Sequence, residues 1–215
     1  MAVKVLFPYI FLFCSVFLCA VPLQAQDLLC EGDLLFCVSP DDNAITDVTT
    51  GIDGRRIDHV AIVHREKGTV FALEAVHRGV VLTPMDSFLL QRDSLVLVGR
   101  LKDTVGVAAS VQRALAFLGR PYDFFFMPDD SAFYCSELVQ KCYRDASGRL
   151  VFDPIPMSFH DKTGIVTPYW KEYYARHGME VPEGWPGSNP GQLSRSNKVC
   201  ILGRFRDLCS PRRRT

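Results

Sequence analysis

Cys135 is the residue of this sequence best placed to act as a nucleophile. It follows a proline-containing loop, and the segment 129–131 (Asp-Asp-Ser) offers several N-caps for a helix that should begin close to it. Unpaired N–H groups and the positive end of the helix dipole favour a thiolate there, and the thiolate is the attacking form of cysteine. The alternative is a buried core cysteine, because Leu138, Val139 and Cys142 continue the same helical stripe.

A nucleophilic cysteine needs a base, and His59 is the histidine whose setting fits that role best. It opens an apolar strand at 59–64, whereas the other four histidines fall at expected surface positions. If residues 65–68 form a four-residue hairpin loop, His59 lies directly opposite Glu74, and the carboxylate would favour a protonated imidazole of fixed tautomer. A turn one residue later would break this pairing, and a plain cross-strand His/Glu pair fits the same geometry.

These residues must be positioned by a mixture of strands and helices. Apolar runs bounded by turn residues predict six strands, at 34–38, 59–64, 69–75, 79–83, 94–101 and 199–205. Apolar residues at helical spacing predict helices at about 104–118, from residues 129–131 through Cys142, and at about 168–177. Residues 39–56 and 181–197 have the composition of loops. We find no repeat and no internal boundary, so we expect one α+β domain over residues 26–215.

The first 25 residues differ in character from the rest. A short basic start up to Lys4 precedes an almost wholly apolar run, Val5 to Val21, and the segment ends on a small residue at Ala25. This layout predicts a secretory signal peptide over residues 1–25, with a retained membrane anchor as the alternative. No later stretch approaches 18 apolar residues, so we expect no membrane span after cleavage and a periplasmic or extracellular location in the cell envelope.

Charge and cysteine spacing exclude some classes of function. Lys plus Arg (24) equals Asp plus Glu (24), which argues against nucleic acid as a partner. No CxxC pair and no HExxH motif is present, so we expect neither a bound metal nor another cofactor. Besides Cys135, five cysteines follow residue 25, and their disulfide pairing is left open: Cys30, Cys37, Cys142, Cys200 and Cys209.

Four segments in this order resemble the permuted papain-like cysteine hydrolases. They are Gly32-Asp33-Leu34-Leu35-Phe36, Asp58-His59-Val60-Ala61-Ile62-Val63, Leu73-Glu74-Ala75 and Tyr134-Cys135-Ser136-Glu137-Leu138-Val139, with 119–123 (Gly-Arg-Pro-Tyr-Asp) between the last two. More narrowly they resemble the YiiX/YaeF-like branch of the NlpC-type peptidases and amidases. Ordinary NlpC-type chains carry the cysteine helix first, whereas here the strand motifs come first. The resemblance implies a circularly permuted papain-like fold, an antiparallel sheet or half-barrel packed against helices, with the cysteine at a helix N-terminus.

The resemblance also implies a catalytic triad of Cys135 as nucleophile, His59 as general base and acid, and Glu74 as the polar third member. The backbone N–H of Cys135 would stabilise the oxyanion, and Tyr134 is a weaker candidate for the same pocket, with a plain buried aromatic as the alternative. The expected function is an exported cysteine peptidase or amidase that cleaves peptide-like amide bonds through a thioester, with peptidoglycan stem peptides as the first substrate class.

Two other functions stay open at this level. Permuted relatives of this kind also include lipid-directed thiol acyltransferases and esterases, and residues 124–127 (Phe-Phe-Phe-Met) would then border an acyl groove, although core packing explains them as well. A non-catalytic ligand-binding module would fit a disulfide-bonded Cys135, for example one paired with Cys37. The count of free thiols separates this reading from the catalytic ones.

Overall fold

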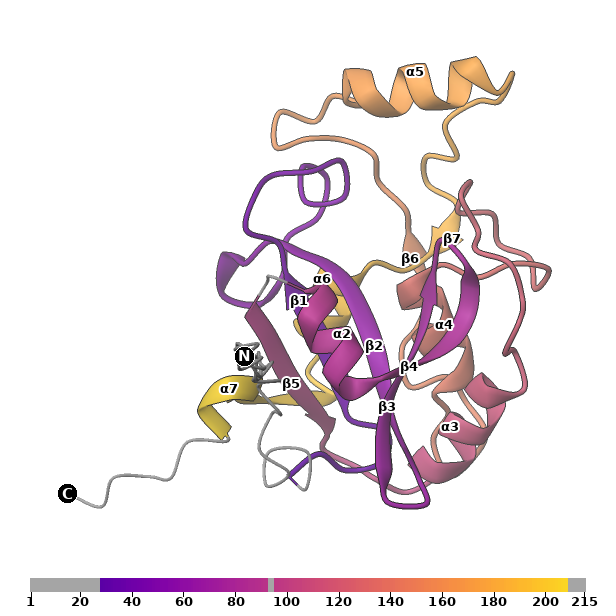
Figure 1. Ribbon diagram of the computed structural model, residues 1–215. Coiled ribbons are helices and arrows are strands. Elements are labelled where there is room, and N and C mark those ends of the chain that lie inside the picture. The colour runs from indigo at the N-terminus through magenta and orange to yellow at the C-terminus, as the bar shows by residue number, and fades with distance from the viewer. Residues whose placement is uncertain (1–27, 93–94, 209–215) are drawn as a thin grey trace, which may run out of the picture.

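A six-stranded antiparallel sheet forms the centre of the protein. The computed structural model describes residues 28–92 and 95–208, and in it the strands run in the order β4-β3-β2-β1-β5-β8 (Figure 1). Their bounds are Leu34–Val38 (β1), Ile57–Glu66 (β2), Thr69–Val76 (β3), Gly79–Pro84 (β4), Leu95–Leu101 (β5) and Val199–Arg204 (β8). All six strands expected from the sequence are present, each within two residues of the expected bounds. The expected α+β class is therefore confirmed.

Helices cover both faces of this sheet. On one face, α3 (Val107–Leu115) and α4 (Cys135–Cys142) pack against the side chains of Leu34, Phe36, Val60 and Ile62. On the other face, α2 (Met85–Gln91) and α7 (Phe205–Leu208) pack against Leu35, Ala61, Val63 and Val98. The two sets alternate along β1 and β2, as the pleat of a sheet buried on both faces requires. No helix in the described ranges is long and apolar enough to cross a bilayer.

The hairpin between β2 and β3 corrects the register expected from the sequence. Glu66 pairs with Thr69, so Lys67 and Gly68 alone form the turn, with φ values of 49° and 83°. Both values are positive, as in the type I′ turns that suit a two-residue hairpin. The turn therefore lies one residue later than assumed, and His59 is not directly opposite Glu74. Continued by one pair beyond Ile62 and Leu73, the observed register sets Glu74 across from Ala61.

A third group of apolar residues lies at one end of the sheet, beneath α5 (Pro168–Arg176). Trp170 and Tyr174 of α5 pack there on Met157 and Phe159, which flank or follow the short strand β6 (Ile155–Pro156). This strand pairs with β7 (Pro186–Gly187) in a separate two-stranded sheet (Figure 1). Partly buried side chains of the segment 39–56 complete the group: Ala44, Ile45 and Val48. That segment also holds a single 3-10 turn, Ile52–Gly54 (η1), so it is an ordered wall and not a simple surface loop.

Three short helices are not among the elements expected from the sequence, and the residue that directly follows one of them belongs to the site. The helix α2 begins directly after Pro84, where only the end of a strand was expected. The helix α6 (Pro190–Ser194) lies inside the expected loop 181–197, and α7 follows β8. Segments of four to seven residues are too short for a helical period to stand out from the chain around them.

Five cysteine thiols are free in the described ranges: Cys30, Cys37, Cys135, Cys142 and Cys200. Cys209 and the predicted signal peptide lie outside those ranges. Cys135 and Cys142 begin and end the same helix, α4, so their separation along it is too long for a bridge. Cys37 and Cys135 are both unpaired, and the disulfide that would have favoured a non-catalytic module is absent between them.

Candidate active site

Cys135 is the first residue of α4, and its setting follows from the way that helix begins. Tyr134 is extended, with φ −95° and ψ 167°, and its carbonyl accepts the first helical hydrogen bond, from the Leu138 N–H at 3.1 Å. The carboxylate of Glu137 accepts a 3.4 Å hydrogen bond from the Tyr134 N–H. The N–H of Cys135 itself belongs to the first turn, where helical N–H groups have no partner within the helix. This end of α4 therefore offers the thiol both free N–H donors and the positive pole of the helix dipole.

Glu137, two residues after Cys135, is buried and paired. Its carboxylate lies 2.8 Å from the ammonium of Lys141, one turn further along α4. Burial is the largest influence on Glu137 and raises its pKa to about 7, although the hydrogen bond and charge of Lys141 act in the opposite direction. Glu137 thus stabilises the start of α4 through its contacts with Tyr134 and Lys141.

His59 and Glu74 form a buried, hydrogen-bonded pair. The Nε2 atom of His59 lies 2.7 Å from Oε2 of Glu74, and the two residues are 7% and 2% exposed. Glu74 accepts two further hydrogen bonds, from the Thr83 hydroxyl at 2.7 Å and from the Arg92 guanidinium at 3.2 Å. The carboxylate is thus held from three sides, and it fixes the plane of the imidazole.

The two pKa values of this pair move apart, as an ion pair requires. Burial raises the pKa of Glu74, but the hydrogen bonds and charge of His59, with those of Thr83 and Arg92, outweigh it and lower the value overall. Burial likewise lowers the pKa of His59. The charge of Cys135 and its interaction with the imidazole, together with the hydrogen bond to Glu74, exceed that effect and raise the value to about 9. Glu74 thus holds the imidazole at Nε2, which leaves Nδ1 available, and the pKa of the imidazole responds to Cys135.

Arg92 is a member of the site that the sequence analysis did not identify. It closes α2, stacks over the Phe88 ring of the same helix at 5.5 Å, and reaches the carboxylate of Glu74. Met85, Phe88 and Leu89 show the three- and four-residue spacing of a short amphipathic helix after Pro84, so a signal for α2 was present. Nothing in the sequence alone indicates that the end of this helix meets a residue of β3.

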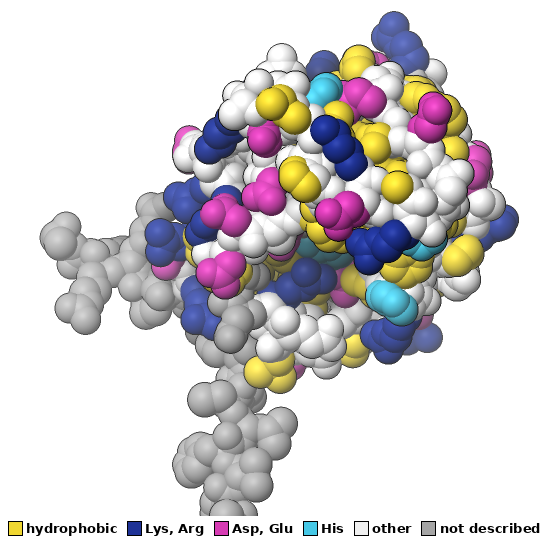
Figure 2. Space-filling model, turned by 90° about the horizontal axis from the view of Figure 1, so that it is seen from above, with side chains coloured by type: hydrophobic (Ala, Val, Ile, Leu, Met, Phe, Trp, Pro, Cys, Tyr) yellow, Lys and Arg dark blue, Asp and Glu magenta, His cyan; other side chains and the backbone are white. Residues whose placement is uncertain are grey.

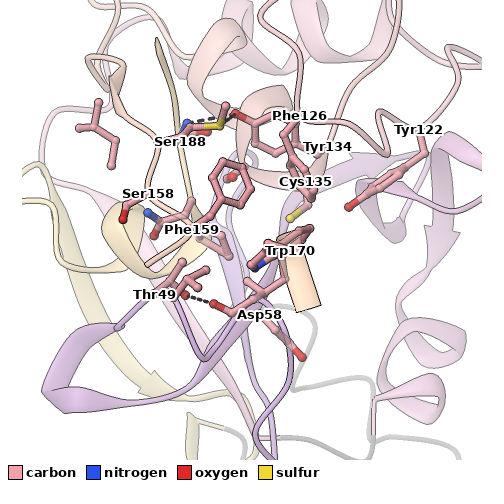
Figure 3. Close-up of a pocket in the computed structure, with 17 residues that line it drawn as sticks. Thr49, Asp58, Tyr122, Phe126, Tyr134, Cys135, Ser158, Phe159, Trp170 and Ser188 are labelled. Atoms are coloured by element: carbon pink, nitrogen blue, oxygen red, sulfur yellow. Dashed lines mark hydrogen bonds between the residues drawn. The ribbon is translucent and has the colours of Figure 1, made fainter. Parts of the chain in front are cut away.

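Cys135 lines a pocket between the sheet and the group of apolar residues beneath α5 (Figure 3). The pocket encloses about 580 Å³ of empty space, part of it open to solvent. Tyr134, the weaker sequence candidate, also lines this pocket and is buried. Its hydroxyl accepts a hydrogen bond from the Ser188 N–H at 3.0 Å and lies 3.9 Å from the Met157 sulfur. Tyr134 is thus a fixed part of the wall.

Tyr122 contributes the other tyrosine hydroxyl of the pocket, and it points toward Cys135 (Figure 3). Burial raises the pKa of Tyr122, and the charge of Cys135 is the next largest cause. Tyr122 bridges to Phe133, two residues before the nucleophile, so the backbone ties the two together. The sequence placed Tyr122 within a motif but gave it no role.

No cluster of three or more His, Cys, Asp and Glu side chains suited to a metal ion occurs in the part of the chain that the structure describes.

Comparison with known proteins agrees with this architecture. The profile of the permuted papain-like amidase enzymes, YaeF/YiiX, C92 family, matches residues 29–161. The uncharacterized protein YiiX of Escherichia coli strain K12 is 38% identical over 72 residues, which are 33% of this chain and 34% of that protein. The crystal structure of "metalloprotein yiiX" from Escherichia coli O157:H7 superposes with a TM-score of 0.67 at 24% identity, covering 81% of this chain and 96% of that one, and so shares the fold. The chain belongs to the permuted papain-like amidase family of YaeF and YiiX.

Proposed function

We propose that this protein is a cysteine hydrolase of peptide-like amide bonds, with Cys135, His59 and Glu74 as its catalytic residues. The observation that carries the proposal is the buried pair of His59 and Glu74, 2.7 Å apart, together with Cys135 at the first position of α4, whose charge acts on the pKa of the imidazole. Membership of an amidase family supports the class of reaction. The match to YiiX covers only a third of that protein, so activity and substrate are proposed here from the site itself.

The proposed reaction has two steps. The Cys135 thiolate attacks the carbonyl carbon, and the oxyanion that forms accepts hydrogen bonds from the Cys135 N–H and the Tyr122 hydroxyl. When the C–N bond breaks, His59 gives its proton to the leaving amine and a thioester remains on the enzyme. A water molecule then attacks the thioester, His59 takes the water's proton, and the acid leaves as the thiol re-forms. Glu74 keeps the imidazole oriented and stabilises its charged form throughout.

Replacement of each catalytic side chain tests this mechanism. Cys135→Ala and His59→Ala should each reduce turnover of fluorogenic peptide amides by about 10³-fold or more while the circular dichroism spectrum stays that of the folded parent protein. Cys142→Ala is the matched control, because Cys142 ends the same helix and burial raises the pKa of its thiol to about 12. Activity in the Cys135 or His59 variant equal to that of the control would overturn the proposal.

We also propose that the protein works outside the cytoplasm, in the cell envelope. The support is the basic, apolar and small-residue order of residues 1–25, which is typical of a cleaved secretory signal. N-terminal sequencing of the protein recovered from cells that express the full chain tests this. A start near Gln26 is the expected result, and an intact Met1 in an active, cell-retained protein would contradict it.

A further inference from the structure

Apolar side chains line most of the pocket beside Cys135. Five aromatic rings (Tyr122, Phe126, Tyr134, Phe159 and Trp170) line it together with the aliphatic chains of Ile45, Val48, Ile155 and Met157. The rings support one another edge to face, with Phe126 5.1 Å from Tyr134 and 5.6 Å from Trp170 between centroids. Trp170 is further fixed by a 3.1 Å hydrogen bond from its Nε1 to the Ala44 carbonyl. The wall is therefore preformed and does not need a ligand to assemble it.

The polar groups of the pocket are few, and two of them have no partner. The hydroxyls of Ser136 and Ser188 line the pocket, are more than nine-tenths buried, and make no hydrogen bond within the described part of the chain. A buried hydroxyl without a partner is costly, so a ligand that supplies one gains binding free energy at that point. Neutral hydroxyls of this kind suit the N–H and C=O groups of a peptide-like ligand.

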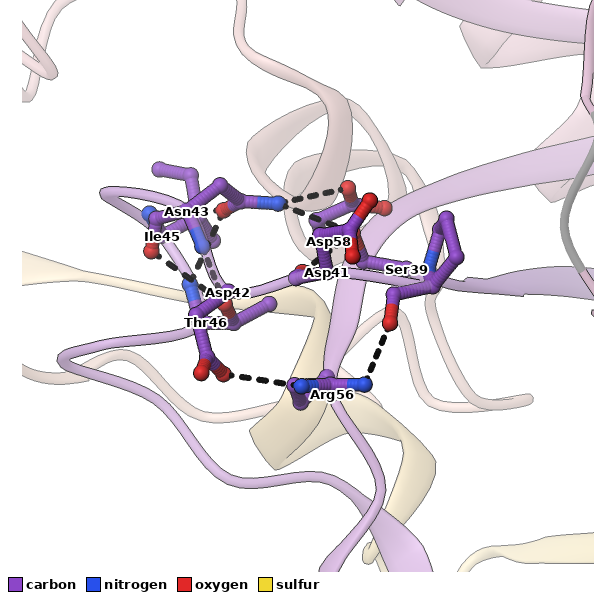
Figure 4. Close-up of polar contacts among 9 residues, drawn as sticks. Ser39, Asp41, Asp42, Asn43, Ile45, Thr46, Arg56 and Asp58 are labelled. Carbon is purple, nitrogen blue, oxygen red and sulfur yellow. Dashed lines mark hydrogen bonds and ion pairs between the residues drawn. The ribbon is translucent and has the colours of Figure 1, made fainter.

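Asp58 is the one Asp, Glu, Lys or Arg among the described residues that line the pocket. It precedes His59 on β2, and its Oδ2 accepts a 2.9 Å hydrogen bond from the Asn43 side chain (Figure 4). Asn43 is held by its own turn, since its Oδ1 accepts the N–H groups of Ile45 and Thr46 at 3.0 and 3.1 Å. The carboxylate is thus anchored at the pocket wall, and no Lys or Arg lines the described pocket to offset it.

The outer surface seen from above is less uniformly apolar than the pocket wall. Viewed from above, its apolar side chains are interspersed with Lys, Arg, Asp and Glu, without forming one continuous patch (Figure 2). Apolar surface is thus concentrated inside the pocket, which indicates a ligand group that inserts there more than a broad apolar surface that docks outside.

We propose that this pocket selects substrates that carry a large apolar side chain next to the scissile amide, and that it rejects carboxylate-bearing ones. The inference rests on the proposed amide hydrolysis and names its substrate class. The aromatic and aliphatic wall binds the apolar group, the two serine hydroxyls meet the amide groups, and Asp58 repels anions. A cell-wall stem peptide, which carries several carboxylates, is accordingly a poorer substrate than a neutral peptide amide.

Binding without turnover tests the selectivity separately from catalysis. The chain has two tryptophans, and Trp185 is outside this pocket, so a Cys135→Ala/Trp185→Phe protein reports on Trp170 alone. The probes are three peptide-like amides of matched backbone: N-acetyl-leucinamide, N-acetyl-glutaminamide and the α-amide of N-acetyl-glutamate. The Trp170 emission should respond to the leucine probe at a concentration at least tenfold below that needed for the glutamate probe, with the neutral glutamine probe between them.

Two further substitutions in that background assign the selectivity to named groups. Asp58→Asn keeps the shape but removes the charge, and it should bring the affinity for the glutamate probe to within about threefold of that for the glutamine probe. Val48→Thr adds a hydroxyl at constant size and should weaken the leucine probe alone. Equal affinity for the leucine and glutamate probes, or an Asp58→Asn protein with unchanged preference, would overturn the inference. Binding of the expected order in a parent protein that hydrolyses no amide would instead overturn the proposed function and leave the pocket assignment standing.

Discussion

His59 and Glu74 meet diagonally across the β2–β3 hairpin, with 2.7 Å between Nε2 and Oε2, although they are not cross-strand partners. Diagonal neighbours share a face of the sheet and are about 7 Å apart at their Cα atoms, a gap that the long side chains of Glu and His close. With the observed two-residue turn, His59 and Glu74 meet as diagonal neighbours. With the four-residue loop expected from the sequence, they would have met as directly opposed residues.

Replacing Glu74 with Gln should separate orientation from charge. The amide retains the size of the carboxylate but no longer stabilises the imidazolium, so the pKa of His59 falls from about 9 toward its ordinary value. We expect kcat/KM to decrease by about 10²-fold or more, as measured with a fluorogenic peptide amide. Thr83→Val, which removes only the 2.7 Å hydrogen bond to the other carboxylate oxygen, is the control and should have a much smaller effect. Equal losses in the two variants would contradict this role of the Glu74 charge.

Arg92 should set the alkaline limit of activity. Its positive charge lowers the pKa of His59, so its removal in Arg92→Met raises that pKa. A group with a raised pKa keeps its proton to higher pH, so the alkaline limb of the pH–rate profile moves upward from about 9. Arg92→Lys retains the charge and should leave the limb near its original position. A limb that moves downward in Arg92→Met would show that Arg92 acts on His59 in some other way.

The two tyrosines of the pocket should respond differently to loss of the hydroxyl. Tyr122→Phe removes the proposed second oxyanion donor and should lower kcat by roughly 10²-fold with little change in KM. Tyr134→Phe removes the acceptor of the Ser188 N–H, and should cost about 1 kcal/mol of unfolding free energy with a smaller loss of kcat. Steady-state kinetics and denaturant titration of both proteins check this. A large loss of kcat in Tyr134→Phe, with little loss in Tyr122→Phe, would contradict this assignment and identify Tyr134 as the oxyanion donor.

Gly187 should tolerate no side chain at the back of the pocket. A Cβ atom there would lie 2.5 Å from the Met157 sulfur and 2.8 Å from the Tyr134 hydroxyl oxygen. Tyr134 cannot retreat without giving up its hydrogen bond to Ser188. Gly187→Ala should therefore destabilise the protein by about 1–3 kcal/mol, seen as a lower Tm in a thermal melt. Gly148→Ala is a contrasting substitution, since that position is open to solvent and only its φ of 83° opposes a side chain. A Gly187→Ala protein with the Tm of the parent would contradict the packing described here.

The elements of this fold were readable from the sequence because most follow strong local patterns. The apolar runs of β1 to β5 and the periodic stripes of α3 and α4 each bury one or two faces, and burial is what the patterns encode. The hairpin register was not readable, because Lys67 adopts a positive φ that the sequence around it does not demand. A one-residue change in the turn moved the predicted partner of His59 by two positions.

The remaining parts of the site depend on contacts between segments that are distant in the sequence. Arg92 reaches Glu74 from a helix of seven residues, and Trp170 enters the pocket from α5 by docking on Ala44, 126 positions earlier. Side-chain types suggested that the segment 39–56 was a surface loop, yet its few apolar residues form one wall of the pocket. Such contacts depend on tertiary packing, and the spacing of residues within one segment of the sequence does not predict them.

The most direct test of the central claim is the pH dependence of Cys135 alkylation in the parent protein and in His59→Ala. Limiting iodoacetamide is used, and peptide mass spectrometry separates Cys135 from Cys142 and the other thiols. If His59 and Cys135 form an ion pair, Cys135 is labelled at pH 6, where an ordinary thiol of pKa near 8.5 reacts hardly at all, and His59→Ala abolishes that labelling. Labelling of Cys135 only above about pH 8 in the parent protein, or labelling at pH 6 that His59→Ala leaves unchanged, would contradict the account.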